Sequence, residues 1–160
     1  MLNFHCKKLQ GAMSLLLIAL IFSGCGFKLR GNYLLAPELQ TLYISSVDKH
    51  GELTRFVKNH LVLNQVKLLK NKTNDVPEVR ILKDTLDRRT LSVFPNGQVA
   101  EYELIYTVRY QLMLVGQEIQ DFTFELNRDY LDDPDIALAK SRELTLMLRE
   151  MRKEASSKIL

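Results

Sequence analysis

The spacing of apolar residues changes several times along the chain, and each spacing predicts a different element. Residues 42–47 form an apolar run of strand length, and residues 65–69 form a short extended piece before the polar loop 71–77. Between them, residues 52–64 predict a helix, because apolar side chains recur there at helical spacing: Leu53, Phe56, Val57 and Leu61. This part of the chain is therefore predicted to be a strand followed by a helix.

Three further strand signals follow the polar loop. Residues 79–93 alternate imperfectly, whereas the strictly alternating stretch after them places one set of side chains on a single face: Tyr102, Leu104, Tyr106, Val108, Tyr110, Leu112 and Leu114. The Asn96-Gly97 pair between them suits a turn that needs positive φ, and Gly116 marks a tight turn before the strand around residues 122–126. These signals predict three consecutive antiparallel strands.

A second helix is predicted at the end of the chain. Asp133 can cap it, Pro134 suits the first helical position, and Asp135 complements the helix dipole. One apolar stripe follows at helical spacing: Leu144, Met147, Leu148, Met151 and Ala155. The order β-α-β-β-β-α predicts a single α+β domain over residues 40–160. We expect a two-layer sandwich, with two helices packed on one face of a four-stranded, mostly antiparallel sheet.

The first 24 residues have the layout of an export signal. Two lysines precede an apolar run at residues 15–22, which is shorter than the about 20 residues that cross a bilayer, and small residues lead directly to Cys25. This order resembles the lipobox of bacterial lipoproteins, whose cysteine receives a diacylglycerol and, after cleavage, an N-acyl chain. We predict a cleaved signal peptide (residues 1–24), an acylated Cys25 and an extended lipidated tether (residues 25–39). The alternative is an ordinary signal peptide with an incidental cysteine.

Composition removes several classes of function. Because both charges in residues 1–24 are lysines, residues 25–160 carry 20 Lys and Arg against 19 Asp and Glu, so the net charge falls from +3 to +1. A net charge this small gives no argument for nucleic-acid binding by the domain as a whole. The two cysteines are Cys6 and Cys25, so the predicted mature domain has no free thiol for redox chemistry, a disulfide or a thiolate metal site.

We expect no catalytic residues and no metal site. After residue 24 the chain has two histidines, His50 in a predicted turn and His60 on the apolar face of the first helix. No nucleophile elbow, phosphate-binding glycine loop or paired-histidine metal motif occurs in the sequence. The tyrosine row between residues 102 and 110 has the composition of a stacking platform for single-stranded nucleic acid. The low net charge and the export signal favour a core face packed under the helices instead.

Several motifs, taken in their order along the chain, resemble those of the LPS-assembly lipoprotein (LptE) family. The resemblance covers essentially everything after the signal peptide, and it rests on these segments: Gly24-Cys25-Gly26-Phe27-Lys28-Leu29-Arg30, Leu61-Val62-Leu63-Asn64, Ser92-Val93-Phe94, Asn96-Gly97-Gln98, Ala100-Glu101-Tyr102, Asp133-Pro134 and Ala137-Leu138-Ala139-Lys140. It implies a non-enzymatic protein with a fold of two helices and four strands, which agrees with the fold predicted from the spacing.

The resemblance also implies a structural and binding role. Members of the family form a heterodimer with LptD, a large outer-membrane β-barrel. They lie inside its lumen facing the periplasmic side, act as plug and assembly partner, and contribute to lipopolysaccharide binding and transport to the outer leaflet. We therefore expect three partners: an LptD-type barrel, lipopolysaccharide and the outer membrane. We expect no nucleic acid and no cofactor beyond the diacylglycerol and N-acyl chain on Cys25. The tyrosine row is an alternative contact for the barrel wall.

Candidate lipopolysaccharide contacts are basic residues, because this lipid carries phosphates and acidic sugars that Arg and Lys bind. Arg88 and Arg89 are candidates in the strand region, and Lys140 matches a lysine of the family motif. The loop Pro95-Asn96-Gly97 is close to a contact proposed for the family, although Pro95 stands where relatives often carry a basic residue. A solvated charged surface is the alternative for these residues. A further function stays open, namely a stand-alone outer-membrane lipoprotein that carries a lipid or small amphiphile in its own cavity.

Overall fold

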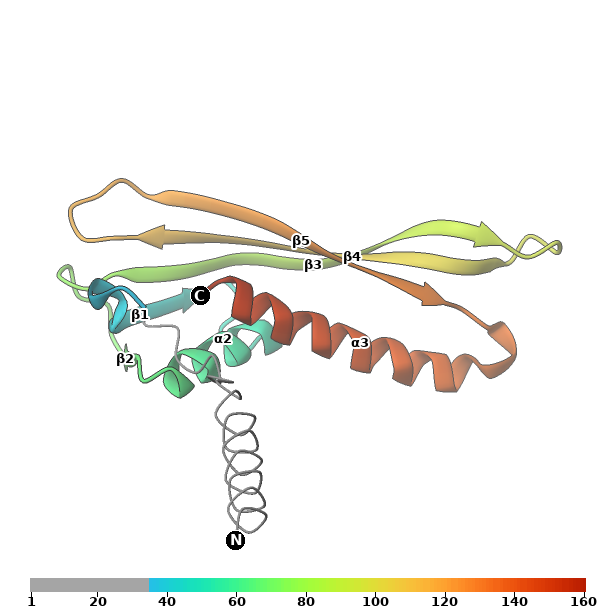
Figure 1. Ribbon diagram of the computed structural model, residues 1–160, viewed down its shortest axis with the longest axis horizontal. Helices are drawn as coiled ribbons and strands as arrows, with labels where there is room; N and C mark the ends of the chain where they lie inside the picture. The colour runs from blue at the N-terminus through green and yellow to red at the C-terminus, as the bar shows by residue number, and fades with distance from the viewer. Residues whose placement is uncertain (1–34) are drawn as a thin grey trace, which may run out of the picture. The chain divides into compact units, whose positions relative to one another are not determined.

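One mixed sheet of five strands organises the domain, which the computed structural model describes in residues 35–160 (Figure 1). The predicted signal peptide, Cys25 and most of the predicted tether lie outside the described residues. The strands lie in the order β2-β1-β3-β4-β5, with these bounds: β1 (Thr41–Ser46), β2 (Lys67–Leu69), β3 (Glu78–Val93), β4 (Val99–Met113) and β5 (Gln120–Leu131). β1 runs parallel to both of its neighbours, whereas β3, β4 and β5 are antiparallel.

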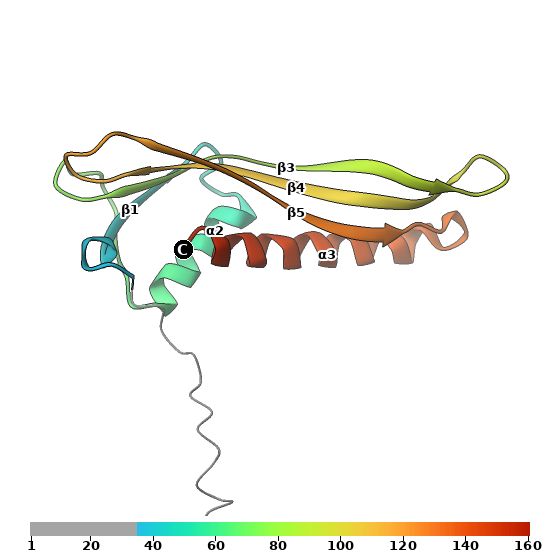
Figure 2. The ribbon, with the colours of Figure 1, turned by 45° about the horizontal axis from the view of Figure 1, so that its top comes forward.

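Two helices cover one face of this sheet. α2 (Glu52–Leu63) lies under the end of the sheet that holds β1, and α3 (Ala137–Lys158) runs back along the long strands (Figures 1 and 2). Within residues 35–160, the opposite face of the sheet carries no helix. The predicted class is therefore confirmed: an α+β domain with two helices on one face of a sheet. Neither α2 nor α3 combines the length and apolar character needed to cross a membrane.

The core lies between the helices and the sheet, and strict alternation in β4 builds its centre. Leu104, Tyr106 and Val108 are fully buried, and they point from successive inward positions of β4. From α3, Met151 and Ala155 close the core as the predicted apolar stripe requires. The remaining buried apolar residues of the described chain join this cluster: Leu42, Ile44, Leu53, Val57, Leu61, Val66, Val79, Ile81, Leu126 and Tyr130.

Both predicted glycine turns occur where positive φ is needed. Gly97 adopts φ +84° in the β3–β4 hairpin, and its N–H donates to the carbonyl of Phe94 (2.9 Å). Gly116 adopts φ +72° in the β4–β5 hairpin. This region of backbone space disfavours side chains with a Cβ, so glycine lets each hairpin close.

Three expectations need correction. The sheet has five strands and not four, because residues 67–69 pair in parallel with β1, and three residues are too few to give a strand pattern. The predicted extended tether ends in a single 3₁₀ turn, η1 (Pro37–Leu39), since proline is compatible with the first helical position. Asp133 caps another 3₁₀ turn, η2 (Pro134–Ile136), by accepting the N–H of Asp135; α3 begins only at Ala137.

Candidate functional site

A polar network inside the sandwich fixes α3 against the sheet. The Tyr106 hydroxyl, fully buried, donates to Oδ2 of Asp84 on β3 (2.6 Å). Arg152 of α3 lies 3.7 Å from the same carboxylate and donates to Glu52 at the start of α2 (2.6 Å). Burial raises the pKa of Tyr106 far above its ordinary value, and the bond to Asp84 adds to that effect. The network therefore ties β3, β4 and both helices together.

Further along the same face, two cations lie over two tyrosines. The guanidinium carbon of Arg88 is 5.8 Å from the ring centroid of Tyr102, and Nζ of Lys140 is 5.3 Å from that of Tyr130. Tyr102 and Tyr130 are direct cross-strand partners of β4 and β5. The hydroxyl of Tyr130 donates to the carbonyl of Lys140 (2.8 Å), which fixes the start of α3 over the strand. We call these four residues the cation–tyrosine patch.

The two cations lie beside neighbouring rings, because Tyr102 and Tyr130 are cross-strand partners. Burial raises the pKa of Tyr130 and Asp132 adds to that effect, whereas Lys140 and Arg88 oppose it. Lys140 itself donates to Glu143 one turn further along α3 (2.9 Å), and this bond raises the pKa of the lysine. Lys140 is therefore fully charged at neutral pH. Of the three predicted contact residues, the structure brings Arg88 and Lys140 together.

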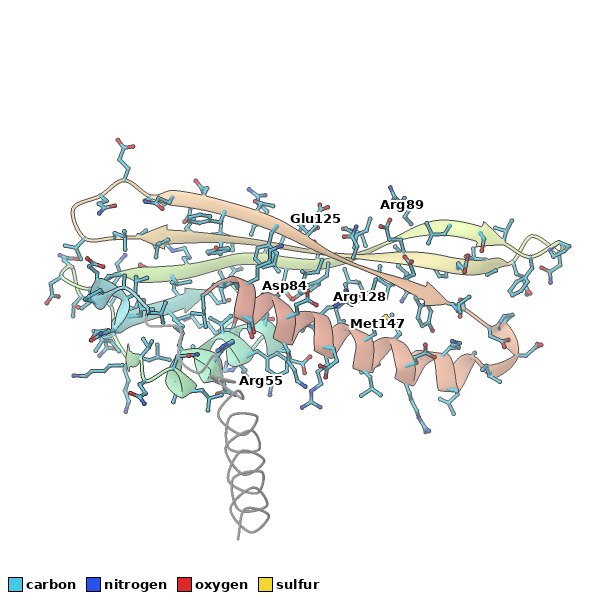
Figure 3. The ribbon with its side chains drawn as sticks, in the orientation of Figure 1. Arg55, Asp84, Arg89, Glu125, Arg128 and Met147 are labelled. Carbon is cyan, nitrogen blue, oxygen red and sulfur yellow. The ribbon has the colours of Figure 1, made fainter. Side chains whose placement is uncertain are left out.

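Arg89 points to the other side of the sheet. It pairs with Glu103 on β4, and Glu103 also accepts a hydrogen bond from Asn127 on β5 (3.0 Å). Figure 3 shows Arg89 and Glu125 on the face without helices, and Asp84 and Arg128 on the side of α3. Arg89 is thus separated from Arg88 and Lys140 by the thickness of the sheet.

The predicted loop Pro95-Asn96-Gly97 forms the exposed tip of the β3–β4 hairpin. β3 ends at Val93, five residues after Arg88, and strands rise by about 3.3 Å per residue, so the tip lies beyond a strand segment of roughly 16 Å. Its neighbours Val93 and Phe94 are also exposed. The tip and the cation–tyrosine patch are therefore two separate surfaces.

The tyrosine row belongs to the core side, as the composition favoured. Tyr106 has no exposed surface, and Tyr110 is stacked on Phe122 with a centroid distance of 5.0 Å. This packing excludes a continuous stacking platform for nucleic acid, and it removes Tyr106 from contact with any barrel wall. Tyr102 is partly exposed to solvent, and the guanidinium of Arg88 lies over its ring.

Both histidines of the described residues make contacts within the fold. His60 lies at the contact between the helices, where its Nδ1 is 3.3 Å from the hydroxyl of Ser157. The backbone N–H of His50 donates to Asp48 in an exposed turn. Within residues 35–160, His, Cys, Asp and Glu form no group of three that would hold a metal ion.

Sequence reasoning missed Tyr130 and Glu143 as members of the site. The partnership of Tyr102 with Tyr130 depends on the register of the β4–β5 hairpin, which the residue spacing does not fix. The contact of Glu143 with Lys140 could have been predicted, because residues three apart on one helix are neighbours.

Comparison with known proteins gives a consistent result. A family model described as LptE, lipopolysaccharide-assembly, matches residues 39–160. The LPS-assembly lipoprotein LptE of Pectobacterium atrosepticum is 37% identical over 145 residues, which cover 90% of this chain and 79% of the relative. That of Yersinia enterocolitica is 36% identical over 145 residues, covering 90% of this chain and 70% of the relative.

Solved structures agree with the sequence comparisons. The crystal structure of the rare lipoprotein B from Shewanella oneidensis superposes with a TM-score of 0.70 at 50% identity, covering 74% of this chain and 89% of that one. A minor lipoprotein from Acinetobacter baumannii shares the fold, with a TM-score of 0.61 at 22% identity over 76% of this chain and 87% of that chain. The family resemblance of the sequence motifs is confirmed, and the chain belongs to the LptE family of lipopolysaccharide-assembly proteins.

Proposed function

We propose that this protein acts in lipopolysaccharide assembly as a lipid-anchored partner of an LptD-type outer-membrane β-barrel. In this proposal it lies in the barrel lumen facing the periplasmic side, plugs the lumen, helps the barrel to assemble and contributes to lipopolysaccharide transport to the outer leaflet. Membership of the LptE family supports the assembly role, and the protein is not an enzyme. The convergence of Arg88 and Lys140 on one aromatic surface carries the binding part of the proposal.

The bare face of the sheet suits a polar lumen. Polar side chains on this face are bonded to one another across the strands: Ser92 with Glu101, Arg89 and Asn127 with Glu103, Thr107 with Glu125, and Gln111 with Asp121. Such a face is already satisfied in water and offers little apolar surface to lipid. The interior of large outer-membrane barrels is polar, so a partner inserted there needs a face of this kind.

The cation–tyrosine patch suits the sugar and phosphate part of a lipopolysaccharide. Arg88 provides a planar fork for a phosphate and Lys140 provides a point charge, while the tyrosine rings offer flat surfaces to sugar rings. Pro95 supplies no cation at the hairpin tip, so in this chain the proposed phosphate contacts are at the patch.

The stand-alone carrier is the weaker alternative. The apolar pocket between η1, the sheet and the last residues of the chain has a volume of about 120 Å³. Ligand sites in proteins usually measure about 300–1,000 Å³, so this pocket is too small for a long acyl chain. The middle of the sandwich is filled by fully buried side chains of β4 and α3.

Anchoring is proposed at Cys25, which lies outside the described residues. Several acyl chains on one residue give stable attachment, whereas one chain gives only marginal binding. Intact mass measurement of protein purified from membranes is expected to show a chain that starts at Cys25 with a diacylglycerol and an N-acyl group. A chain that does not start at Cys25, or that carries no lipid on this residue, would contradict this anchor.

Charge reversal tests the binding part. We expect Arg88→Glu and Lys140→Glu each to weaken retention of lipopolysaccharide by the purified protein by about tenfold, the size of one lost charge-assisted bond. Arg89→Glu is the matched control, because it changes the neighbouring residue on the opposite face. Equal losses from Arg88→Glu and Arg89→Glu would contradict a contact confined to the side of α3. Folding of each variant is checked by circular dichroism.

A further inference from the structure

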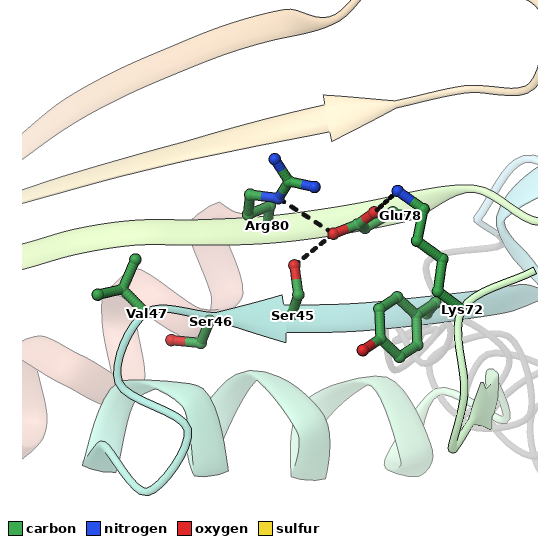
Figure 4. A pocket seen from close by; sticks show the side chains of 7 residues that line it. Ser45, Ser46, Val47, Lys72, Glu78 and Arg80 are labelled. Atoms are coloured by element: carbon green, nitrogen blue, oxygen red, sulfur yellow. Dashed lines mark hydrogen bonds and ion pairs between the residues drawn. The ribbon is translucent and has the colours of Figure 1, made fainter.

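A second charged site lies on the bare face of the sheet, close to β1. A pocket of about 350 Å³ opens there (Figure 4). It is lined by side chains of β1 and the residue after it, of β3, and of the loop between β2 and β3: Tyr43, Ser45, Ser46, Val47, Lys72, Glu78 and Arg80. The order β2-β1-β3 forces loop 70–77 to cross β1, since it leaves one neighbour of β1 and enters the other. That crossing brings Lys72 to the pocket.

A nearly buried carboxylate forms the base of this pocket. The side chain of Glu78 is only 2% exposed, although it lies on the face without helices. Three donors surround it: Nζ of Lys72 lies 2.6 Å from Oε2, while Nε of Arg80 (3.1 Å) and the hydroxyl of Ser45 both donate to Oε1. Burial works to raise the pKa of Glu78, but the bonds from Lys72, Ser45 and Arg80 outweigh it and lower the pKa. Glu78 is therefore a fixed anion.

The pocket nevertheless keeps one uncompensated positive charge. Two cations face one carboxylate, and among the residues that line the pocket Glu78 is the acid. Arg80 uses only Nε in its bond to Glu78, and no described side chain or carbonyl is bonded to its two terminal nitrogens. Lys72 is half exposed, with N–H groups to spare. Figure 4 shows the guanidinium of Arg80 beside Glu78, with its terminal nitrogens turned away from the helix.

Burial of Glu78 explains how these donors are held. A buried carboxylate is costly unless cations and hydrogen-bond donors compensate it. Here Arg80 and Ser45 donate to Oε1 and the ammonium of Lys72 pairs with Oε2, which fixes the stem of Arg80 through Nε and holds Lys72 at the pocket. The free end of Arg80 is then presented as a fork, the arrangement that binds phosphate oxygens in a bidentate manner.

We infer that this pocket binds a phosphate group, held by the terminal nitrogens of Arg80 and the ammonium of Lys72. Tyr43 is among the residues that line the same pocket. The phosphate is either free or a monoester on a lipid, since both present the same oxygens. The site is on the opposite face of the sheet from the cation–tyrosine patch, and its occupation by free phosphate does not depend on the proposed function.

Phosphate titration of the full-length protein in detergent tests the site. Two-dimensional NMR at constant ionic strength follows the Arg80 Nε–H signal and the backbone amides of Ser45 and Val47. We expect saturable shifts with inorganic phosphate, and about tenfold or greater weakening in Arg80→Gln. Lys83→Gln is the matched control, because Lys83 is an exposed lysine of β3 on the same face and is expected to leave the affinity unchanged. Shifts that Arg80→Gln leaves unchanged overturn the proposal. Shifts that rise linearly with inorganic phosphate also overturn it, unless phosphorylated lipid A saturates the site.

Arg80→Lys keeps the test valid if Arg80→Gln unfolds. It retains a cation for Glu78 but loses the fork, so a folded Arg80→Lys variant with full phosphate affinity also overturns the proposal. Micelles containing lipid A, with or without its phosphates, identify the source. Saturation by the phosphorylated form alone assigns the site to a lipid-linked phosphate, and saturation by inorganic phosphate alone assigns it to free phosphate. Saturation by neither refutes the site.

Discussion

Tyr106→Phe removes one hydroxyl from the centre of the polar network and leaves the ring in place. The lost bond is short (2.6 Å), it is partly buried, and its acceptor Asp84 is charged. Hydrogen bonds to charged groups contribute about 1.5–3 kcal/mol, and among the described residues Asp84 keeps only Arg152, at 3.7 Å, as a partner. We therefore expect the free energy of unfolding at pH 7 to fall by about 2 kcal/mol. For a domain of this size that corresponds to a melting temperature lower by about 8 °C.

The same variant changes the response to alkaline pH. The folded state raises the pKa of Tyr106, so the proton is bound more tightly in the folded than in the unfolded chain. The stabilisation is complete below the unfolded pKa of about 10 and is lost as the pH rises above it, at up to about 1.4 kcal/mol per pH unit. The difference between wild type and Tyr106→Phe should accordingly shrink between pH 10 and pH 11.5.

Urea unfolding of both proteins at a series of pH values measures these differences. Tyr102→Phe is the matched control, because the described residues provide no hydrogen-bond partner for its hydroxyl, and its loss should stay below about 0.5 kcal/mol. A difference for Tyr106→Phe that stays constant from pH 8 to pH 11.5 would refute the assignment of the raised pKa. A loss no larger than that of Tyr102→Phe would refute the stabilising bond itself.

Three other substitutions have clear expectations. Met151→Ala opens a cavity in the core, so the free energy of unfolding, measured with heat or urea, should fall by about 2–5 kcal/mol. Leu146→Ala on the exposed side of α3 should lower it by less than about 0.7 kcal/mol. Equal effects would contradict the packing of α3. Gly97→Ala places a side chain at φ +84° and should cost about 1 kcal/mol, and the same change at Gln98 should cost less, which differential scanning calorimetry resolves. Folding lowers the pKa of Glu78, so this group stabilises the protein above its unfolded pKa of 4.5, and that stabilisation is lost as the pH falls further. Glu78→Gln should therefore destabilise the protein at pH 7 but much less at pH 3. A loss of equal size at both pH values would exclude that ion pairing.

Local chemistry made much of the fold predictable. The strict alternation of β4 identifies Leu104 and Val108 as core residues because a strand has a fixed period of two. The stripe that ends in Met151 identifies the buried side of α3 for the same reason at a period of 3.6. Gly97 marks its turn because few other residues adopt positive φ. Each of these signals is contained in a few neighbouring residues.

The faces of β3 were not predictable in the same way. A register shift lies between Ile81 and Lys83, so odd-numbered residues face the helices before it and even-numbered residues after it. The imperfect alternation of residues 79–93 was the trace of this bulge in the sequence. Its consequence is that Arg88 and Arg89, adjacent in sequence, serve opposite faces.

Contacts between segments far apart in the sequence also could not be predicted from the spacing of apolar residues. β2 becomes a strand because β1 lies beside it, and Glu78 is buried because Lys72 and Arg80 come from a crossing loop and from its own strand. Neither contact follows from the composition of the segments concerned. The phosphate pocket and the fifth strand were missed for this reason.

Affinity purification from detergent-solubilised outer membranes tests the central claim most directly. Full-length protein with a C-terminal tag is recovered, washed at high salt, and analysed for the identity and stoichiometry of whatever remains bound. The account predicts one large β-barrel protein in near-equal amount, because a plug inside a lumen forms a lasting complex that salt does not dissociate. Recovery of the lipoprotein alone with a bound lipid, and with no barrel, would contradict the account and favour the stand-alone carrier.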